Sequence, residues 1–159
     1  MRHAKSAWDT NDVDFDRPLA ARGLRDRATM ARWIHDRGLC PDKVLSSAAA
    51  RARTTAQHVA ETCQLPADQV VYDERLYHAG FRQWLSWLRA QTCERLLVCG
   101  HNPTLDHLVE TLTADVVPLS ASGKLMTTAA VAHLNFDGAW ADFGPGDWAL
   151  RDIARPREL

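Results

Sequence analysis

Two histidines and two arginines of this sequence stand in patterns that suit phosphoryl chemistry. His3 follows Arg2 in "RHAKS", His101 follows the apolar run "LLVCG", and Arg51 follows "SSAAA". Guanidinium groups hold phosphate oxygens in bidentate fashion, and a neutral imidazole can attack phosphorus to form a phosphohistidine. If these four side chains meet at one site, they can move a phosphoryl group without a metal ion.

The elements expected to position these residues alternate along the chain. Short apolar runs predict strands, and apolar residues at helical spacing predict the helices between them. This alternation predicts a three-layer α/β fold, in which helices cover both faces of a mostly parallel central sheet. The expected strands are Asp42 to Ser47, Gln69 to Tyr72, Glu94 to Gly100 and Ala129 to Phe136, and the expected helices are Gly23 to Arg37, Arg51 to Cys63, Arg82 to Gln91 and Thr104 to Leu112.

Ligands of open α/β sheets bind at the carboxyl ends of the strands, where Ser47 and His101 are expected to lie. Thr104 is expected to cap the helix after His101, and Gly38 to end the first helix. Asp137 and Gly138 predict a hairpin that pairs "VAHLNF" with "AWADF". The breaker stretch "FGPGDW" is interpreted as a loop before a short tail, and residues 1–159 as a single domain.

Composition sets further bounds. The formal net charge of −1 excludes a bulk field that would recruit nucleic acid or an anionic membrane. No apolar run is long enough to span a membrane and no signal peptide is recognisable, so we expect a cytoplasmic protein. The four cysteines form no C-x-x-C pair, and we expect reduced thiols rather than a disulfide or a zinc site. Oligomeric state cannot be predicted.

The motifs "RHAKSAWD", "DRPLAARG", "SSAAARARTTA", "GHNP" and "RPREL" resemble the histidine phosphatase superfamily, and within it the SixA-type phosphohistidine phosphatases. The resemblance covers almost the whole chain and implies a phosphoglycerate mutase-like fold without a cofactor. It implies that His3 is the nucleophile, that Arg2 and Arg51 bind the phosphoryl group, and that His101 is the second catalytic histidine. Ser47 and Asn102 are expected as further substrate contacts.

Three departures from the family pattern bear on the site. The apolar strand that normally leads into the Arg-His pair is absent before Arg2, which suggests a truncated first strand. His78 stands where many relatives carry a glutamate that protonates the leaving group, and Glu74 is an alternative acid. Ala20 replaces the Thr or Asn that could cap the first helix, at a cost of about 1 kcal/mol.

The sequence therefore predicts a metal-independent phosphatase that works through phospho-His3. Its substrate would be a phosphorylated protein or a small phosphorylated molecule, and a protein with phosphohistidine is favoured because that leaving group needs little acid help. The alternative is a catalytically impaired phosphate-binding module of the same fold. A mutase is disfavoured because so short a chain leaves little room for a lid. His101 and His107 are six residues apart, which does not place two metal ligands on one helix face.

Overall fold

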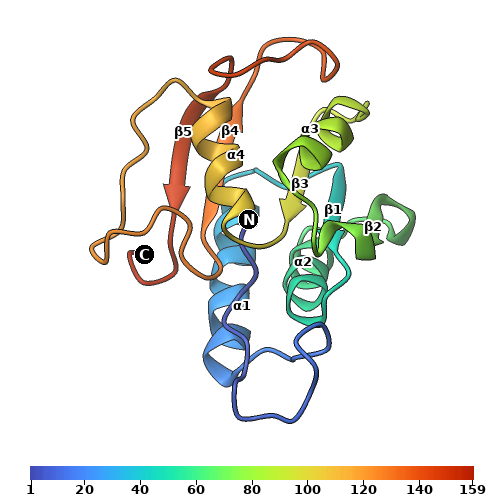
Figure 1. The fold of residues 1–159 in the computed structure, drawn as a ribbon, viewed down its shortest axis with the longest axis vertical. Helices are drawn as coiled ribbons and strands as arrows, with labels where there is room; N and C mark the ends of the chain where they lie inside the picture. The colour runs from blue at the N-terminus through green and yellow to red at the C-terminus, as the bar shows by residue number, and fades with distance from the viewer.

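The computed structural model describes residues 1–159 and has a parallel sheet at its centre (Figure 1). Three strands form this sheet in the order β2-β1-β3, and two later strands form a separate antiparallel pair, β4-β5. The expected α/β class and the four expected strands are confirmed. The strands are β1 (Lys43–Ser47), β2 (Val70–Asp73), β3 (Leu96–Cys99), β4 (Val131–Asn135) and β5 (Ala149–Ala154).

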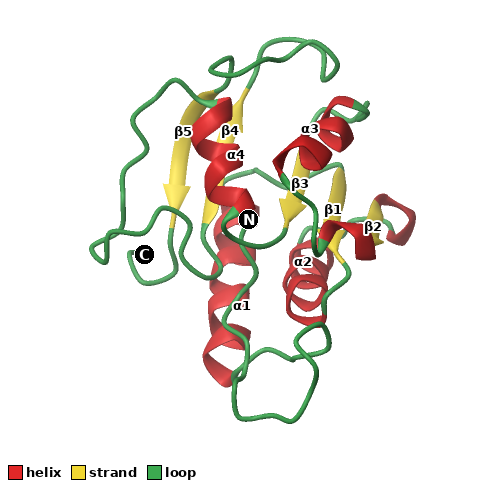
Figure 2. Ribbon diagram, in the orientation of Figure 1, coloured by secondary structure: helices red, strands yellow, loops and turns green.

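Helices cover both faces of the sheet, as expected (Figure 2). Alternate residues of β1 point to opposite faces: Val44 joins an apolar core with α1 and α2, and Leu45 joins another with α3 and α4. The sheet therefore has one apolar core on each face, and the three layers are α1 with α2, the sheet, and α3 with α4. The helices are α1 (Ala21–Asp36), α2 (Ala50–Thr62), α3 (Phe81–Arg89) and α4 (Thr104–Leu112), with 3₁₀ turns η1 (Ala67–Gln69) and η2 (Glu74–Leu76).

The first residues of the chain connect the two sheets. The backbone N–H of His3 donates to Gly100 beside β3, and the N–H of Arg2 donates to Ala130 beside β4. Arg2 and His3 therefore lie between β3 and β4, at the end of the position that a central strand would take. A cavity of about 690 Å³ continues from Met1 between β3 and β4 and is lined mainly by apolar side chains of these strands and α4.

The hairpin expected at Asp137 and Gly138 is wrong. Residues 140–142 form a turn, and β4 pairs instead with β5, which was expected to be a tail. The reason is aromatic packing: Phe143 is fully buried and makes an edge contact with Phe136, so "AWADF" is buried as a loop cluster rather than as a strand.

The expectation of four reduced cysteines is also wrong. Cys40 and Cys63 form a disulfide across a sequence separation of 23 residues, whereas Cys93 and Cys99 are free. Cys40 follows the end of α1 and Cys63 ends α2. Because both helices lead away from the same edge of the sheet, their carboxyl ends meet, and neither spacing nor composition could show this.

The helix ends give mixed results. Gly38 has a positive φ of 67° directly after α1, as a helix stop requires. Ala20 precedes α1 without a side-chain cap, as expected from its type. The predicted cap at Thr104 is wrong, because the residue before α4 is Pro103 and the Thr104 hydroxyl donates to the carbonyl of Ala79.

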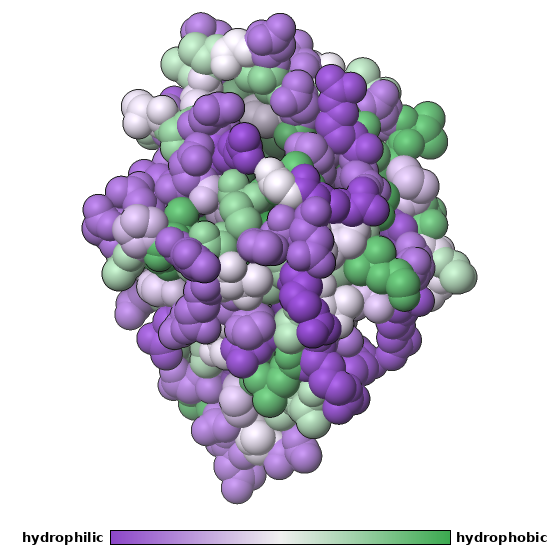
Figure 3. Space-filling view, turned by 180° about the vertical axis from the view of Figure 1, so that it is seen from behind, coloured by the Kyte–Doolittle hydropathy of each residue, from purple (hydrophilic) through white to green (hydrophobic).

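None of the helices combines the length and the apolarity that crossing a bilayer requires. The face seen in Figure 3 is mainly hydrophilic, with separate apolar patches between charged and polar side chains.

Candidate active site

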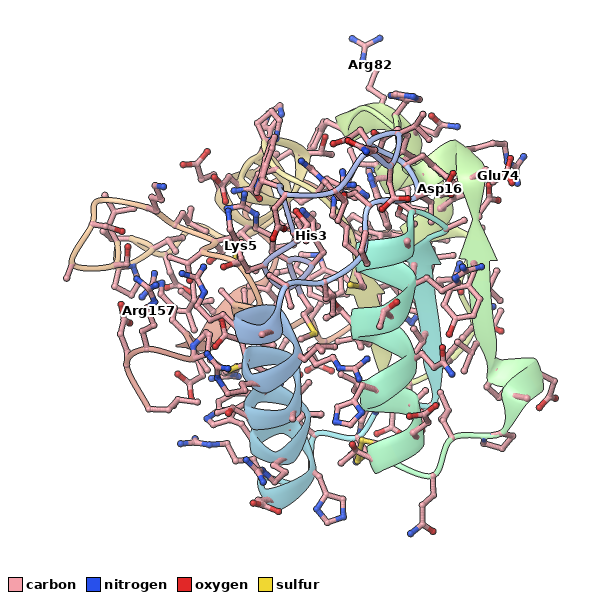
Figure 4. All side chains as sticks on the ribbon, turned by 90° about the horizontal axis from the view of Figure 1, so that it is seen from below. His3, Lys5, Asp16, Glu74, Arg82 and Arg157 are labelled. Carbon is pink, nitrogen blue, oxygen red and sulfur yellow. A yellow bond between two sulfur atoms is a disulfide. The ribbon has the colours of Figure 1, made fainter.

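The structure brings the predicted histidines together at the carboxyl ends of the central strands. The rings of His3 and His101 lie 5.0 Å apart between centroids. Ser47, the last residue of β1, makes a hydrogen bond of 2.9 Å between its Oγ and Nε2 of His101. Arg51 enters from the first turn of α2, and Figure 4 shows His3 near the centre of the molecule, between α1 and α2.

His3 is held as a neutral imidazole with one nitrogen free. Its Nδ1 lies 2.7 Å from the carbonyl oxygen of Ala4. A carbonyl oxygen can only accept, so Nδ1 carries the proton and Nε2 keeps its lone pair. Burial lowers the pKa of His3 to about 3, and the charges of Arg51 and Arg2 act in the same direction. At neutral pH this side chain has the protonation state of a nucleophile.

His101 is neutral for the same physical reason. Burial lowers its pKa to about 4, with a further lowering from the positive charge of Arg51. The Ser47 hydroxyl that contacts His101 also accepts a hydrogen bond of 3.3 Å from the N–H of Ala49, which fixes that hydroxyl in place. Ser47 therefore orients His101, in addition to its predicted role as a substrate contact.

The two arginines bring an excess of buried N–H donors. Nη1 of Arg2 donates to the carbonyl of Met126 at 2.8 Å. Arg51 is almost completely buried and donates to Asp14. The Nε–H groups of both arginines are buried without an acceptor. A site in which donors exceed acceptors is suited to an anion.

Asp14 is the site residue that sequence reasoning missed. Its carboxylate accepts from Arg51 at 2.9 Å and from Arg17 at 2.6 Å, and the Tyr77 hydroxyl donates to it as well. The Tyr77 hydrogen bond and the Arg51 guanidinium lower the pKa of Asp14. Asp14 lies in a loop with three other aspartates and follows no strand, so no pattern singled it out.

Asn102 lies beside the site, but its amide group is engaged elsewhere. Its Nδ2 donates to Asp106 at 2.8 Å and to the carbonyl of Met126 at 3.2 Å. The same Met126 carbonyl accepts from Arg2. The geometry therefore favours Asn102 as a residue that positions Arg2, and its contact with substrate stays a prediction.

The two candidate acids lie at different distances from the histidines. His78 packs against Tyr77 with ring centroids 4.3 Å apart, and its charge contributes to the lowered pKa of His101. Glu74 is exposed at the start of η2, and Figure 4 shows it at the edge of the molecule, away from His3. Of the two, His78 is the one placed near the reacting groups.

No group of three or more His, Cys, Asp or Glu side chains is arranged to hold a metal ion. His107, which the sequence raised as a possible partner of His101, stacks on Phe81 with ring centroids 4.2 Å apart.

Comparison with known proteins agrees with this geometry. The sequence model of the histidine phosphatase superfamily (branch 1) matches residues 1–86. The uncharacterised protein Rv1276c of Mycobacterium tuberculosis is 36% identical over 99% of this chain and 100% of its own length. The phosphohistidine phosphatase SixA of Escherichia coli is 29% identical over 86% of this chain and 83% of its own. A structure of the protein histidine phosphatase SixA complexed with tungstate has a TM-score of 0.81 at 25% identity, covering 100% of this chain and 96% of that one.

Proposed function

Because the chain belongs to the histidine phosphatase superfamily and is a phosphatase of that type, we propose that it removes phosphoryl groups from phosphohistidine through a covalent intermediate on His3. The observation that carries the proposal is the neutral His3 ring. Its Nδ1–H is fixed by Ala4, and its free Nε2 lies in a site with two arginines and a second neutral histidine.

In the first step, Nε2 of His3 attacks phosphorus and the bond from phosphorus to the substrate imidazole breaks. The departing imidazole keeps that electron pair and takes up a proton from solvent. In the second step, water attacks phosphorus, the bond to Nε2 breaks and its electron pair returns to Nε2. One water proton remains on the phosphate product and the other passes to solvent. Arg2 and Arg51 balance the charge of the phosphoryl oxygens in both steps, and neutral His101 donates a hydrogen bond to them.

The state of the acids favours phosphohistidine over an alkyl phosphate ester. An alkoxide leaving group needs a strong proton donor, whereas an imidazole leaves readily and can be protonated by solvent. Asp14 is the carboxylate bound to Arg51, and its lowered pKa keeps it ionised and unable to donate. The related SixA proteins are named phosphohistidine phosphatase and protein histidine phosphatase, which supports phosphohistidine as the substrate class.

The test compares the wild-type chain with His3→Ala, and His35→Ala serves as the control because His35 is an exposed histidine on α1. A ³²P-phosphohistidine peptide is the substrate, and both released phosphate and trapped phosphoenzyme are measured with a chelator present. We expect His3→Ala to lose turnover by a factor on the order of 1000 or more and to trap no label. Equal turnover in His3→Ala would refute the mechanism.

The alternative of a phosphate-binding module without turnover predicts a different result for the same wild-type sample. Phosphate would raise the melting temperature while no labelled phosphate is released. Release over many turnovers by the wild-type chain would exclude the module.

A further inference from the structure

The negative charge inside the candidate site comes from the chain itself. Arg51 directs two of its nitrogens at one residue: Nη1 donates to the Asp14 carbonyl at 2.5 Å and Nη2 to the Asp14 carboxylate at 2.9 Å. A planar guanidinium uses such a pair of N–H groups to hold a phosphoryl group. Asp14 therefore covers the donors that a phosphate would need.

Two neighbours complete a cradle for this carboxylate. Arg17 contacts it at 2.6 Å, and the Tyr77 hydroxyl donates to it. The charge of Asp14 also reaches His101, because it opposes the lowering of the His101 pKa by Arg51. Asp14 thus interacts with the groups that surround a bound phosphoryl group in the proposed function.

The loop that carries Asp14 is exposed on its outer side. Figure 1 shows it as the dark blue loop at the lower end of the molecule. Its inner end is tied to α2 by the Phe15 carbonyl, which accepts from the N–H of Ala50. Its outer part has few buried contacts: Trp8 is 71% and Val13 67% exposed, and the Trp8 ring packs against the Arg17 guanidinium. Segments with so few buried contacts open at low free-energy cost.

We infer that Asp14 is an internal anion that binds the phosphate-binding face of Arg51 and is displaced by a phosphoryl dianion. The inference rests on the proposed function, since it takes Arg51 as a phosphate-binding side chain. A phosphoryl dianion carries twice the charge of the carboxylate and repels it, so the two cannot share Arg51. A weakly bound monoanion carries too little charge to displace the Asp14 carboxylate from Arg51.

Displacement has a consequence for the product. When hydrolysis leaves inorganic phosphate on Arg51, the tethered carboxylate competes for the same donors at a high effective concentration. Asp14 therefore weakens phosphate binding, which limits inhibition by product. Removing its charge should tighten the binding of inorganic phosphate and lower KM together.

The experiment measures inorganic phosphate binding by titration calorimetry at fixed ionic strength on the whole chain. Asp14→Asn removes the charge and keeps the size of the side chain. Asp12→Asn is the matched control, because Asp12 is an exposed aspartate of the same loop that makes no hydrogen bond or ion pair. Because Asp14 is half exposed, we expect Kd to fall about 3- to 10-fold in Asp14→Asn and less than about 2-fold in Asp12→Asn.

Asp14→Asn that binds phosphate no more tightly than Asp12→Asn overturns the inference, since a residue that merely holds Arg51 in place would weaken binding when lost. If Asp14→Asn does not fold, Asp14→Ser answers the same question with the same expected direction. Binding requires no turnover, so an inactive wild-type chain would refute the proposed function and would leave this comparison decisive.

Discussion

Lowering the pH from 7 to 5 should destabilise the folded protein through the two buried histidines of the candidate site, His3 and His101. The pKa of His3 is lowered to about 3 and that of His101 to about 4, from 6.5 in the unfolded chain. Between these values the unfolded state binds more protons than the folded state. Stability therefore rises with pH in this interval and falls as acid is added.

The magnitude follows from the same pKa values. Over the interval from pH 7 to pH 5, each of the two histidines lowers the free energy of unfolding by about 2 kcal/mol, so the pair removes about 4 kcal/mol. That is a large part of the roughly 5 to 15 kcal/mol that holds a domain folded. Asp14 has a pKa lowered from 3.8, so its contribution to stability is lost only below that interval and does not obscure the effect.

Urea unfolding at pH 5, 6 and 7 at constant ionic strength measures this dependence. His3→Gln replaces one titrating ring by an amide, so the loss of stability between pH 7 and pH 5 should shrink by the ~2 kcal/mol that His3 contributes. His35→Gln on the surface of α1 should keep the wild-type dependence. If His3→Gln also keeps it, His3 is not held neutral in the folded state, and the argument for a free Nε2 nucleophile fails.

Two further predictions concern the frame around the site. Reducing the Cys40–Cys63 disulfide should lower the free energy of unfolding by about 3 kcal/mol, the loop-closure value for a separation of 23 residues. Urea unfolding with and without dithiothreitol checks this, with Cys93→Ser as a control that should respond like wild type; equal stability of both redox forms would contradict it. Gly23→Ala places a Cβ 2.1 Å from the Lys5 carbonyl oxygen, so the free energy of unfolding should fall by ~1 to 3 kcal/mol, seen as a lower midpoint in urea, despite the better helix propensity of alanine. An unchanged midpoint would contradict this prediction, because it would mean that the backbone at Lys5 shifts to accommodate the added Cβ at no cost in stability.

The placement of His101, Ser47 and Arg51 at one candidate site could be predicted because it depends on strand ends. His101 and Ser47 directly follow apolar runs that read as strands, and a parallel sheet brings such positions to one edge. Arg51 lies within the first helical turn after a strand, which limits where it can be. Local patterns and one topological rule were sufficient for these residues.

The failures of prediction come from contacts between distant segments. The Cys40–Cys63 disulfide forms because the ends of two helices lie close together in space. The sequence separation of 23 residues does not predict that proximity. The wrong hairpin arose because Asp137 and Gly138 are a strong local turn signal. Burial of Phe143 against Phe136 outweighs that signal, and the partner strand of β4 comes later in the chain.

Asp14 shows why the sequence does not reveal the resting state of the site. Motifs indicate which groups are expected to bind a phosphoryl dianion, but they do not say which carboxylate pairs with Arg51. A nearly buried guanidinium without an anion would be costly, and burial also requires His3 and His101 to stay neutral. The carboxylate of Asp14, 2.9 Å from Nη2 of Arg51, meets this requirement. Because any aspartate on the loop could have served, only the fold shows which one does.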